Sequence, residues 1–448
     1  MRRLPVLGVV VVLAVQPAAG CASVSEAGSR RSDLQEFREL VLGRDHSYAT
    51  QARAEAETRL ARLESDAARI SAAAFELELA RLVALADNGH TMAFASPRSR
   101  RYNHVGLRLV PLGQDFYVLR ARDENADLLG ARLAGIDRQP LEALREAART
   151  LSGGLPAWRD RFAPYLLESP EQMEALGLVP QREGAVYRFT TIDGTTVERR
   201  LEAGPPGGAR ERGDSSRWLH PELQESEKGS WRTLISPGQA PWSLLDPDEP
   251  FRWRDAPEIE GMVIELRQST DHGGRSIRSF FEEMTRRLRE SRPANLVLDM
   301  RLNGGGDLTR TRDFMQSLPG LVPGRIFALT SPWTFSAAIS SLGYLKQTAP
   351  GRVTIVGEPV GDRLQFWAEG RPLELSYSHA MIQIATQRHD YLTGCRTFAD
   401  CHEEVRVHPI SVTTLDPDLP APWTIDAYRS GRDPAMEAVA AALRTPIP

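Results

Sequence analysis

Lysine is almost missing from this chain of 448 residues: Lys228 and Lys346 are the only two, so nearly all of its positive charge comes from arginine. No lysine follows the glycine run at 304–306 in the P-loop pattern, which argues against a Walker-type nucleotide site. The formal net charge of -4 provides no basic field for nucleic acid. The composition therefore favours a soluble globular protein that does not bind nucleic acid.

Long hydrophobic runs are missing as well, apart from one near the N-terminus. The run from Leu4 to Val15 follows two arginines and precedes small residues that end at Cys21. It is too short to span a membrane and is typical of an export signal. We therefore expect residues 1–21 to be a signal and the mature chain to be extracytoplasmic, in the periplasm or cell envelope.

The end of this segment, AAGC, resembles the lipobox of bacterial lipoproteins. The resemblance implies that Cys21 is acylated and that the mature chain meets the membrane only through this lipid. Plain secretory cleavage and a short uncut anchor are the alternatives.

Cysteine is scarce too: besides Cys21, the chain has only Cys395 and Cys401, in GCRTFADC. In an oxidising compartment such a short loop can close a disulfide. A metal site needs more ligands than these cysteines and the adjacent His402. We therefore expect a disulfide and no metal.

The pattern of polar and apolar residues divides the chain into five parts. Alternation of strands and helices from Glu260 onward predicts a mostly parallel sheet covered by helices. Before it, a hairpin turned at Asp193–Gly194 belongs to a small module with several strands. The five parts are a signal at 1–21, a tether at 22–33, a helical domain at 34–95, an α/β or β-rich module at 96–217 and an α/β core at 218–448.

Two stretches of the core carry candidate chemistry. Gly304, Gly305 and Gly306 follow a predicted buried strand, where consecutive glycines let backbone N–H groups face a ligand. Ser336 lies where the next predicted strand meets a helix, and the N–H of Ala337 could join one from the glycine loop in an oxyanion hole. A serine before a helix is usually an N-cap. Thr334 could cap this helix instead, which favours Ser336 as a nucleophile.

A serine nucleophile needs a base. Lys346 lies on the predicted helix of Ser336 itself, about 15 Å away at the helical rise, and Lys228 has no supporting context. Histidine is therefore the default. His90, in the polar turn DNGHT, is the leading candidate because the turn suggests a mobile, exposed side chain. The other candidate histidines are His104, His379, His389, His402 and His408, and the candidate acids are Glu403, Glu404, Glu358 and Asp390.

Five segments, in order, resemble motifs of the carboxyl-terminal processing (tail-specific) and tricorn-type serine peptidases. They are DNGHT, NLVLDMRLNGGGD, TSPWTFSAA, TIVGEPVGD and YRSGRDPAMEAVAAAL. The resemblance implies a crotonase-like α/β protease core with Ser336 as nucleophile. It also implies an oxyanion hole from Ala337 and a glycine among Gly304, Gly305 and Gly306.

The two branches of this family differ in their base. The processing branch places a lysine where this chain reads Gly361-Asp362-Arg363. The tricorn-type branch uses a histidine and a late glutamate, and the segment HEEVRVHPI resembles that region with Glu403 in the acidic role. The resemblance thus points to Ser336, His90 and Glu403.

The family often carries a PDZ domain, and residues 103–150 resemble part of one, so the module at 96–217 is expected to be PDZ-like. Taken together, the sequence predicts an exported serine peptidase that acts on a peptide or protein, with no metal or organic cofactor. Two alternatives remain: a catalytically inactive member that binds a peptide or other ligand, and an enzyme that acts on small esters.

Overall fold

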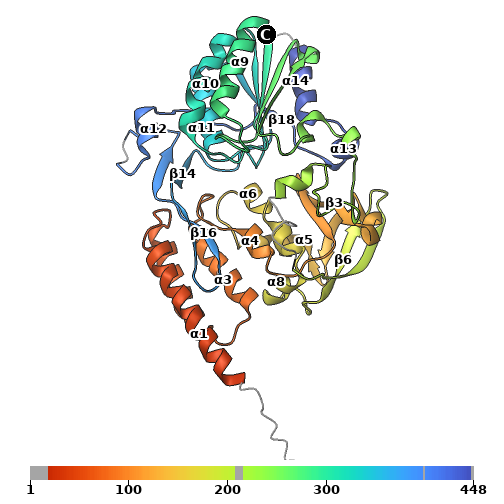
Figure 1. Ribbon diagram of the computed structural model, residues 1–448, viewed down its shortest axis with the longest axis vertical. Coiled ribbons are helices and arrows are strands. Elements are labelled where there is room, and N and C mark those ends of the chain that lie inside the picture. The colour runs from red at the N-terminus through yellow and green to blue at the C-terminus, as the bar shows by residue number, and fades with distance from the viewer. Residues whose placement is uncertain (1–18, 207–214, 397–398, 445–448) are drawn as a thin grey trace, which may run out of the picture.

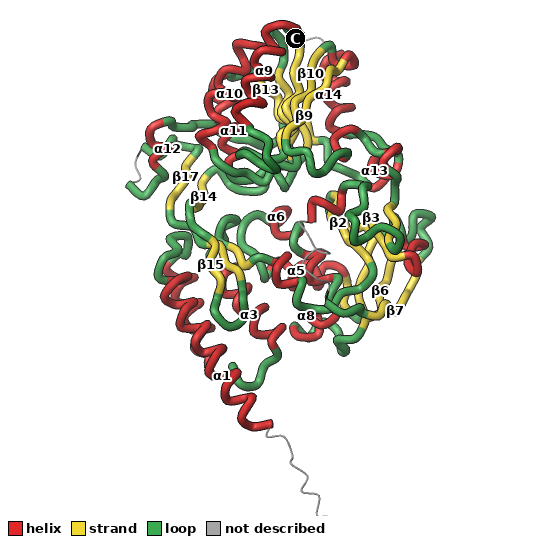
Figure 2. Tube along the Cα trace, viewed as in Figure 1, coloured by secondary structure: helices red, strands yellow, loops and turns green. Residues whose placement is uncertain are grey.

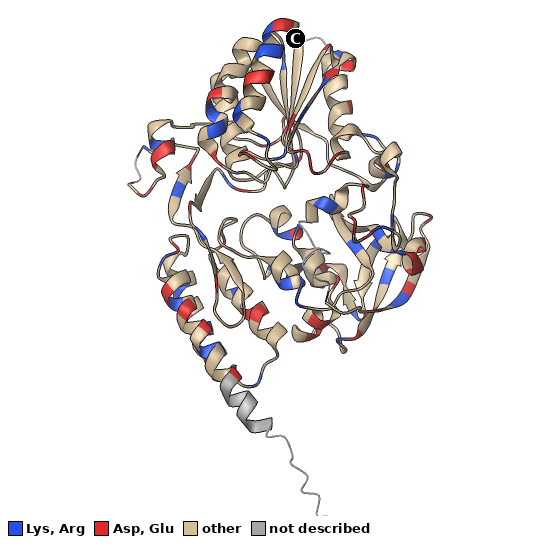
Figure 3. Ribbon diagram, in the orientation of Figure 1, with Lys and Arg blue, Asp and Glu red and all other residues tan. Residues whose placement is uncertain are grey.

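The computed structural model describes residues 19–206, 215–396 and 399–444. In Figure 1 the upper lobe holds a sheet flanked by helices, and the lower part holds the N-terminal helices beside a second sheet. This arrangement confirms the expected fold class, an α/β core preceded by a helical region and a β-rich module. Acidic and basic residues occur together on both lobes (Figure 3).

The N-terminal region is helical, but its first part is not a tether. The helices are α1 (Ala19–Glu36), a π-helical turn (Phe37–Leu42), α2 (Thr50–Asp66) and α3 (Ala72–Ala84). Residues 22–33, expected to be a tether, lie within α1. Arg30 donates to the carbonyl oxygen of Ala67 at 2.8 Å, and Asp33 accepts from the N–H of Tyr377 at 2.8 Å. These bonds hold the helix against the rest of the chain.

The expected signal at 1–21 lies outside the described residues except for its last three. Cys21, the candidate lipidation residue, falls in the first turn of α1. Among the described residues, the search for a helix with the length and apolarity of a membrane span found none.

The module after this region is built on an antiparallel sheet in the order β2-β3-β4-β6-β7. The expected hairpin at Asp193–Gly194 joins β6 and β7, and Gly194 has the positive φ of 85° that such a turn favours. Residues 231–233 also pair with this sheet, so the module extends beyond the expected boundary at 217. Its strands are β2 (Leu107–Leu112), β3 (Asp115–Arg122), β4 (Arg132–Ile136), β5 (Gln139–Pro140), β6 (Gly184–Thr190), β7 (Thr196–Glu202) and β8 (Trp231–Thr233). Its helices are α4 (Ala95–Ser99), α5 (Leu141–Arg149), α6 (Pro156–Asp160), α7 (Ala163–Leu167) and α8 (Pro170–Ala175).

The core is a six-stranded sheet in the order β18-β13-β12-β11-β10-β9, parallel except for β9. Neighbouring residues of one strand pack on opposite faces of the sheet. Ile264 packs in the cluster with α9 to α11, and Val263 packs with Val439 of α14. Burial on both faces explains the continuous apolar strands seen in the sequence. The strands are β9 (Phe251–Ala256), β10 (Gly261–Leu266), β11 (Asn295–Asp299), β12 (Ile326–Thr330), β13 (Val353–Gly357) and β18 (Leu419–Pro420). The helices are α9 (Ile277–Ser291), α10 (Leu308–Leu321), α11 (Ala337–Thr348) and α14 (Pro434–Arg444), with the shorter α13 (Ile425–Arg429) before α14.

Between β13 and β18 the chain leaves the core and returns. It forms a two-stranded ribbon, β14 (Gln365–Ala368) with β17 (Gln387–Asp390), and a hairpin, β15 (Pro372–Glu374) with β16 (Met381–Gln383), that adds to β1 (Met92–Ala93). Helix α12 (Glu403–Val407) follows the ribbon, and Figure 2 shows the ribbon between the core and the N-terminal helices. A disulfide joins Cys395 to Cys401 with an S–S distance of 2.22 Å. The excursion therefore connects the core to residues around His90.

Candidate active site

The turn after β11 is fastened by Asn303, which is fully buried. Its side-chain oxygen accepts from the Gly305 N–H at 2.9 Å, and its carbonyl oxygen accepts from the Phe335 N–H at 3.0 Å. The Gly305 N–H is therefore already used and is not an oxyanion donor. Gly304 and Gly306 are exposed and keep that role open.

Ser336 directly precedes α11 with φ 54° and ψ −124°. This conformation is unfavourable for a residue with a side chain, and a strained strand-to-helix turn is typical of an exposed nucleophilic serine. The Ser336 side chain makes no capping hydrogen bond. Thr334 does not cap the helix either, because its hydroxyl accepts from the Ser331 N–H at 3.0 Å and donates to the carbonyl oxygen of Met300 at 2.9 Å. That threonine instead ties the serine turn to the end of β11.

The structure brings the glycine loop and Ser336 into contact. A Cβ atom at Gly305 would lie 2.6 Å from the Cβ of Ser336 and 3.2 Å from the nitrogen of Ala337, and the φ of Gly305 is 105°. Only glycine fits this position. The N–H of Ala337 opens α11, where N–H groups have no acceptor within the helix. Two turns of the parallel sheet thus place free N–H groups beside one serine.

His90 lies in the turn between α3 and β1, but it is neither exposed nor mobile as its sequence context suggests. Its Nδ1 is 3.2 Å from the Oδ2 of Asp362, and the two side chains are only 12% and 1% exposed. The ring lies between those of Phe335, at a centroid distance of 4.2 Å, and Phe366, at 4.9 Å. Its Nε2 is buried and has no hydrogen-bond partner within the described part of the chain. A carboxylate at Nδ1 favours the tautomer that leaves a lone pair on Nε2, as a general base requires.

The turn that carries His90 is held against β14. The Asn88 amide donates to the carbonyl oxygen of Trp367 at 3.0 Å and accepts from the N–H of the same residue at 3.1 Å. Asp87 forms an ion pair with Arg363 at 2.8 Å. These contacts fix the histidine relative to the loop that carries Asp362.

The structure does not place Glu403 beside His90. Glu403 is exposed at the start of α12, and neither ring nitrogen of His90 bonds to it. The next candidate acid, Glu404, pairs with Arg312. The likeness of HEEVRVHPI to the family segment therefore does not correspond to a contact between either glutamate and His90.

The remaining two candidate acids are also bound elsewhere. Glu358 accepts from the N–H of Trp423, and burial raises the pKa of its carboxyl to about 7. Asp390 accepts from the N–H groups of Leu392 at 3.0 Å and Thr393 at 2.9 Å, in its own turn. Hydrogen bonds from this turn and from Gln365 lower the pKa of Asp390 despite its desolvation.

Sequence reasoning missed Asp362. It occupies the slot Gly361-Asp362-Arg363, where the processing branch would place a lysine, and it is 272 residues from His90 in the chain. The available signal was chemical: with the lysine gone, a carboxylate in that slot could support a histidine. The absence of the lysine was evident from the sequence, but a role for the aspartate in its place was not predicted.

The other candidate histidines have their partners elsewhere in the fold. His104 belongs to the β-rich module, where it bridges to Gly204. His379 pairs with Glu374 on the surface, and His408 lies 3.8 Å from Glu404. His389 and His402 gather around a different carboxylate, that of Glu369.

Similar proteins were found among solved structures, but not by comparison with family models or curated sequences. No protein-family model matches the chain, and no curated protein matches it significantly. Mature CPAF complexed with lactacystin is 14% identical, with a TM-score of 0.57 over 93% of this chain and 98% of that chain. Mature CPAF alone is 12% identical, with a TM-score of 0.57 over 93% and 97%.

The photosystem II D1 C-terminal processing protease is 13% identical over 94% of this chain and 98% of that chain, but its TM-score of 0.40 is too low to support an argument. At such identities a likeness shows the fold and not the activity. The resemblance that the motifs indicated is confirmed at this level: the chain has the fold of mature CPAF along nearly its whole length.

Proposed function

We propose that this protein is a serine peptidase in which Ser336 is the nucleophile, His90 the general base and Asp362 the carboxylate that orients the histidine. The observation that carries the proposal is the His90 ring, with Nδ1 on a buried carboxylate and Nε2 unpartnered beside the residue that precedes Ser336. Asp362 takes the place that the sequence assigned to Glu403.

The reaction follows from these positions. The Ser336 hydroxyl attacks the peptide carbonyl carbon while His90 Nε2 takes its proton. The carbonyl oxygen becomes an oxyanion, which the N–H groups of Ala337 and of Gly304 or Gly306 stabilise. The imidazolium then gives its proton to the departing amine as the C–N bond breaks. A water molecule hydrolyses the acyl-enzyme by the same route in reverse.

Among the described residues, Nε2 of His90 has no hydrogen-bond partner, so its hydrogen bond to Ser336 is not formed in the structure. Such bonds are often long before substrate binds and tighten in the reactive complex. The stacking of His90 on Phe335 keeps the base next to the nucleophile without pinning its Nε2.

The test is labelling of residues 22–448, a form without the export segment and the candidate lipidation residue, with a fluorophosphonate probe. We expect the wild type to be labelled and Ser336→Ala and His90→Ala to be unlabelled. His379→Ala is the matched control and should be labelled like the wild type, because His379 also has a carboxylate at Nδ1 but lies on the surface. A folded wild type that is never labelled would favour the inactive binding protein instead. Labelling without hydrolysis of any peptide, but with hydrolysis of small esters, would favour the esterase.

The proposal includes export with acylation at Cys21. The apolar run before this residue and the AAGC sequence support it. Expression of the full chain in a bacterium fed a clickable fatty acid should give a labelled protein in the membrane fraction. Cys21→Ser should abolish the label. An unlabelled wild type that is found in the soluble periplasmic fraction would favour plain secretion.

A further inference from the structure

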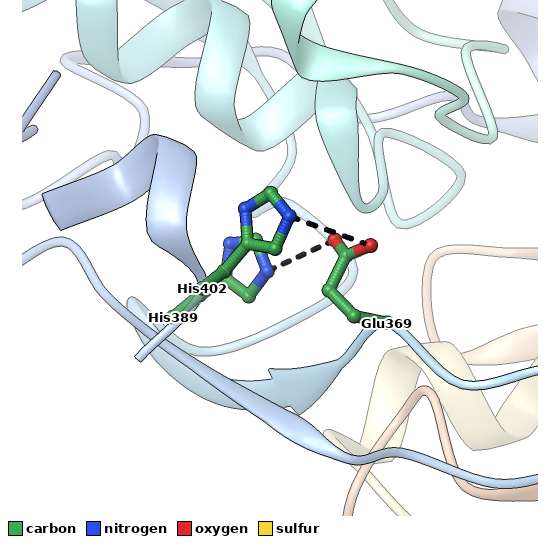
Figure 4. A group of neighbouring side chains, drawn as sticks. All are labelled: Glu369, His389 and His402. Atoms are coloured by element: carbon green, nitrogen blue, oxygen red, sulfur yellow. Dashed lines mark hydrogen bonds and ion pairs between the residues drawn. The ribbon is translucent and has the colours of Figure 1, made fainter. Parts of the chain in front are cut away.

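A second cluster of chemically active side chains lies on the ribbon behind His90. Glu369 follows β14, His389 lies on β17 and His402 directly precedes α12. One ligand atom from each residue can be chosen such that all three lie within 4.8 Å of one another. Figure 4 shows both imidazoles directed at the same carboxylate.

The distances within the cluster are those of a nearly formed metal site. The Nε2 of His389 is 3.1 Å from one carboxylate oxygen of Glu369, and the Nε2 of His402 is 3.9 Å from the other. Ligands at about 2.0–2.1 Å around a tetrahedral Zn²⁺ lie about 3.3 Å apart. The two nitrogen–oxygen separations fall on either side of this value, and all three ligand atoms lie within 4.8 Å of one another. The two imidazole rings are stacked with 5.4 Å between their centroids, so they would have to rotate for both Nε2 atoms to face one ion.

The backbone that carries the three ligands is already ordered. Phe366 pairs with His389 across the ribbon, and the N–H of His402 donates to the carbonyl oxygen of Arg388 at 2.9 Å. The disulfide of Cys401 holds the segment just before His402. A site whose ligands come from three fixed segments costs little ordering when an ion binds.

The surroundings of the two imidazoles also suit a metal. The Nδ1 of His389 is 2.8 Å from the hydroxyl of Tyr391, which in turn is 2.6 Å from the hydroxyl of Ser340. A hydrogen-bond partner at Nδ1 fixes the ring and directs the other nitrogen toward a metal. The Nδ1 of His402 is buried and has no hydrogen-bond partner among the described residues, and its ring stacks on that of His389 at a centroid distance of 5.4 Å.

We infer that Glu369, His389 and His402 form a binding site for a divalent transition-metal ion, with Zn²⁺ as the best-matched ion. Two imidazoles and one carboxylate are a set that Zn²⁺ takes with a fourth position left to water. As a metal ligand, His402 was considered from the sequence only together with Cys395 and Cys401. In the structure these cysteines bond to each other, and the histidine meets different partners.

Zinc binding tests the inference directly and independently of peptidase activity. The mature chain, freed of metal with a chelator, is titrated with Zn²⁺ in competition with a chromophoric chelator. We expect one equivalent to bind the wild type, and Glu369→Gln and His402→Ala to bind at least about 100-fold more weakly. Co²⁺ in place of Zn²⁺ should give visible absorption bands in the wild type that both variants lose.

The chain supplies a matched control in Glu374 and His379, a surface pair whose side chains are 54% and 65% exposed. The double variant Glu374→Gln/His379→Ala should bind zinc like the wild type. Glu369 and His402 are partly exposed, so their variants should fold, which circular dichroism verifies. The inference is overturned if the wild type binds no zinc in this competition, or if the control loses as much affinity as the two cluster variants.

Discussion

Two turns of this protein each present a histidine whose Nδ1 faces a carboxylate, and they differ in almost everything else. His90 and Asp362 are 12% and 1% exposed, whereas His379 and Glu374 are 65% and 54% exposed. The surface pair is the closer one, with 2.6 Å between nitrogen and oxygen against 3.2 Å at His90. A short histidine–carboxylate distance is therefore a poor guide to function.

The surroundings of the two turns distinguish them. His90 is stacked between two phenylalanine rings, and its partner comes from a segment 272 residues away. The partner of His379 is five residues away, across the tip of its own hairpin. An exposed pair of this kind is screened by water and contributes little to stability. A buried carboxylate at Nδ1 favours one tautomer of His90 and fixes the orientation of its ring, and catalysis by a histidine needs both.

The largest difference between the two pairs should follow from neutralising each carboxylate. We expect Asp362→Asn to slow fluorophosphonate labelling of Ser336 by about 10⁴-fold, because an amide favours the wrong histidine tautomer. Glu374→Gln should leave the labelling rate within about twofold of the wild type. Rates are measured by gel fluorescence over time. Equal effects of the two substitutions would remove the distinction between the pairs.

A second difference should appear in stability. Asn88→Ala deprives the N–H and carbonyl of Trp367 of their partner, and we expect the free energy of unfolding to fall by about 2 kcal/mol. In the turn of His379, Ser378→Ala removes one hydrogen bond of 3.3 Å to the Ala380 N–H and should cost about 0.5 kcal/mol. Urea denaturation measures both. A cost at Ser378 that equals the cost at Asn88 would mean that the two turns are held alike.

A third prediction concerns Glu358, which lies four residues before Asp362 in the same loop. Burial raises the pKa of its carboxyl to about 7 from an ordinary value of 4.5. Between these pH values the folded chain holds a proton that the unfolded chain has lost, so this carboxyl makes stability fall as pH rises from 4.5 to 7.

Glu358→Gln should remove this part of the pH dependence. We expect its melting temperature to fall less than that of the wild type between pH 5 and pH 8, as measured by differential scanning fluorimetry at several pH values. Asp362→Asn serves as the comparison, since that residue belongs to the histidine pair. An unchanged slope in Glu358→Gln would contradict the raised pKa.

Much of the fold was predictable because its signals are local. Apolar strands alternating with amphipathic helices indicated the parallel core, and a glycine between two strands indicated the β6–β7 hairpin. The helical content of α1 was missed because its sequence is rich in Ser and Gly, which have lower helix propensity than Ala or Leu. Tertiary bonds from Arg30 and Asp33 stabilise it instead.

Part of the candidate site was predictable, because the sequence signals for that part are also local. Ser336, its neighbouring N–H groups and the glycine loop form one compact pattern near the ends of adjacent strands. The carboxylate was not predictable, because its meeting with His90 depends on the long excursion between β13 and β18. The buried setting of His90 was missed as well, since a polar turn looks exposed until Phe335 and Phe366 enclose it.

The separation of these residues along the chain has a consequence for biosynthesis. His90 leaves the ribosome 246 residues before Ser336, and the rest of the ribbon comes later still. At ordinary rates of synthesis this interval is roughly 12–50 s. A nascent chain that holds only the N-terminal domain and the β-rich module contains neither Ser336 nor Asp362. The site proposed here would therefore be assembled only after most of the chain had been made.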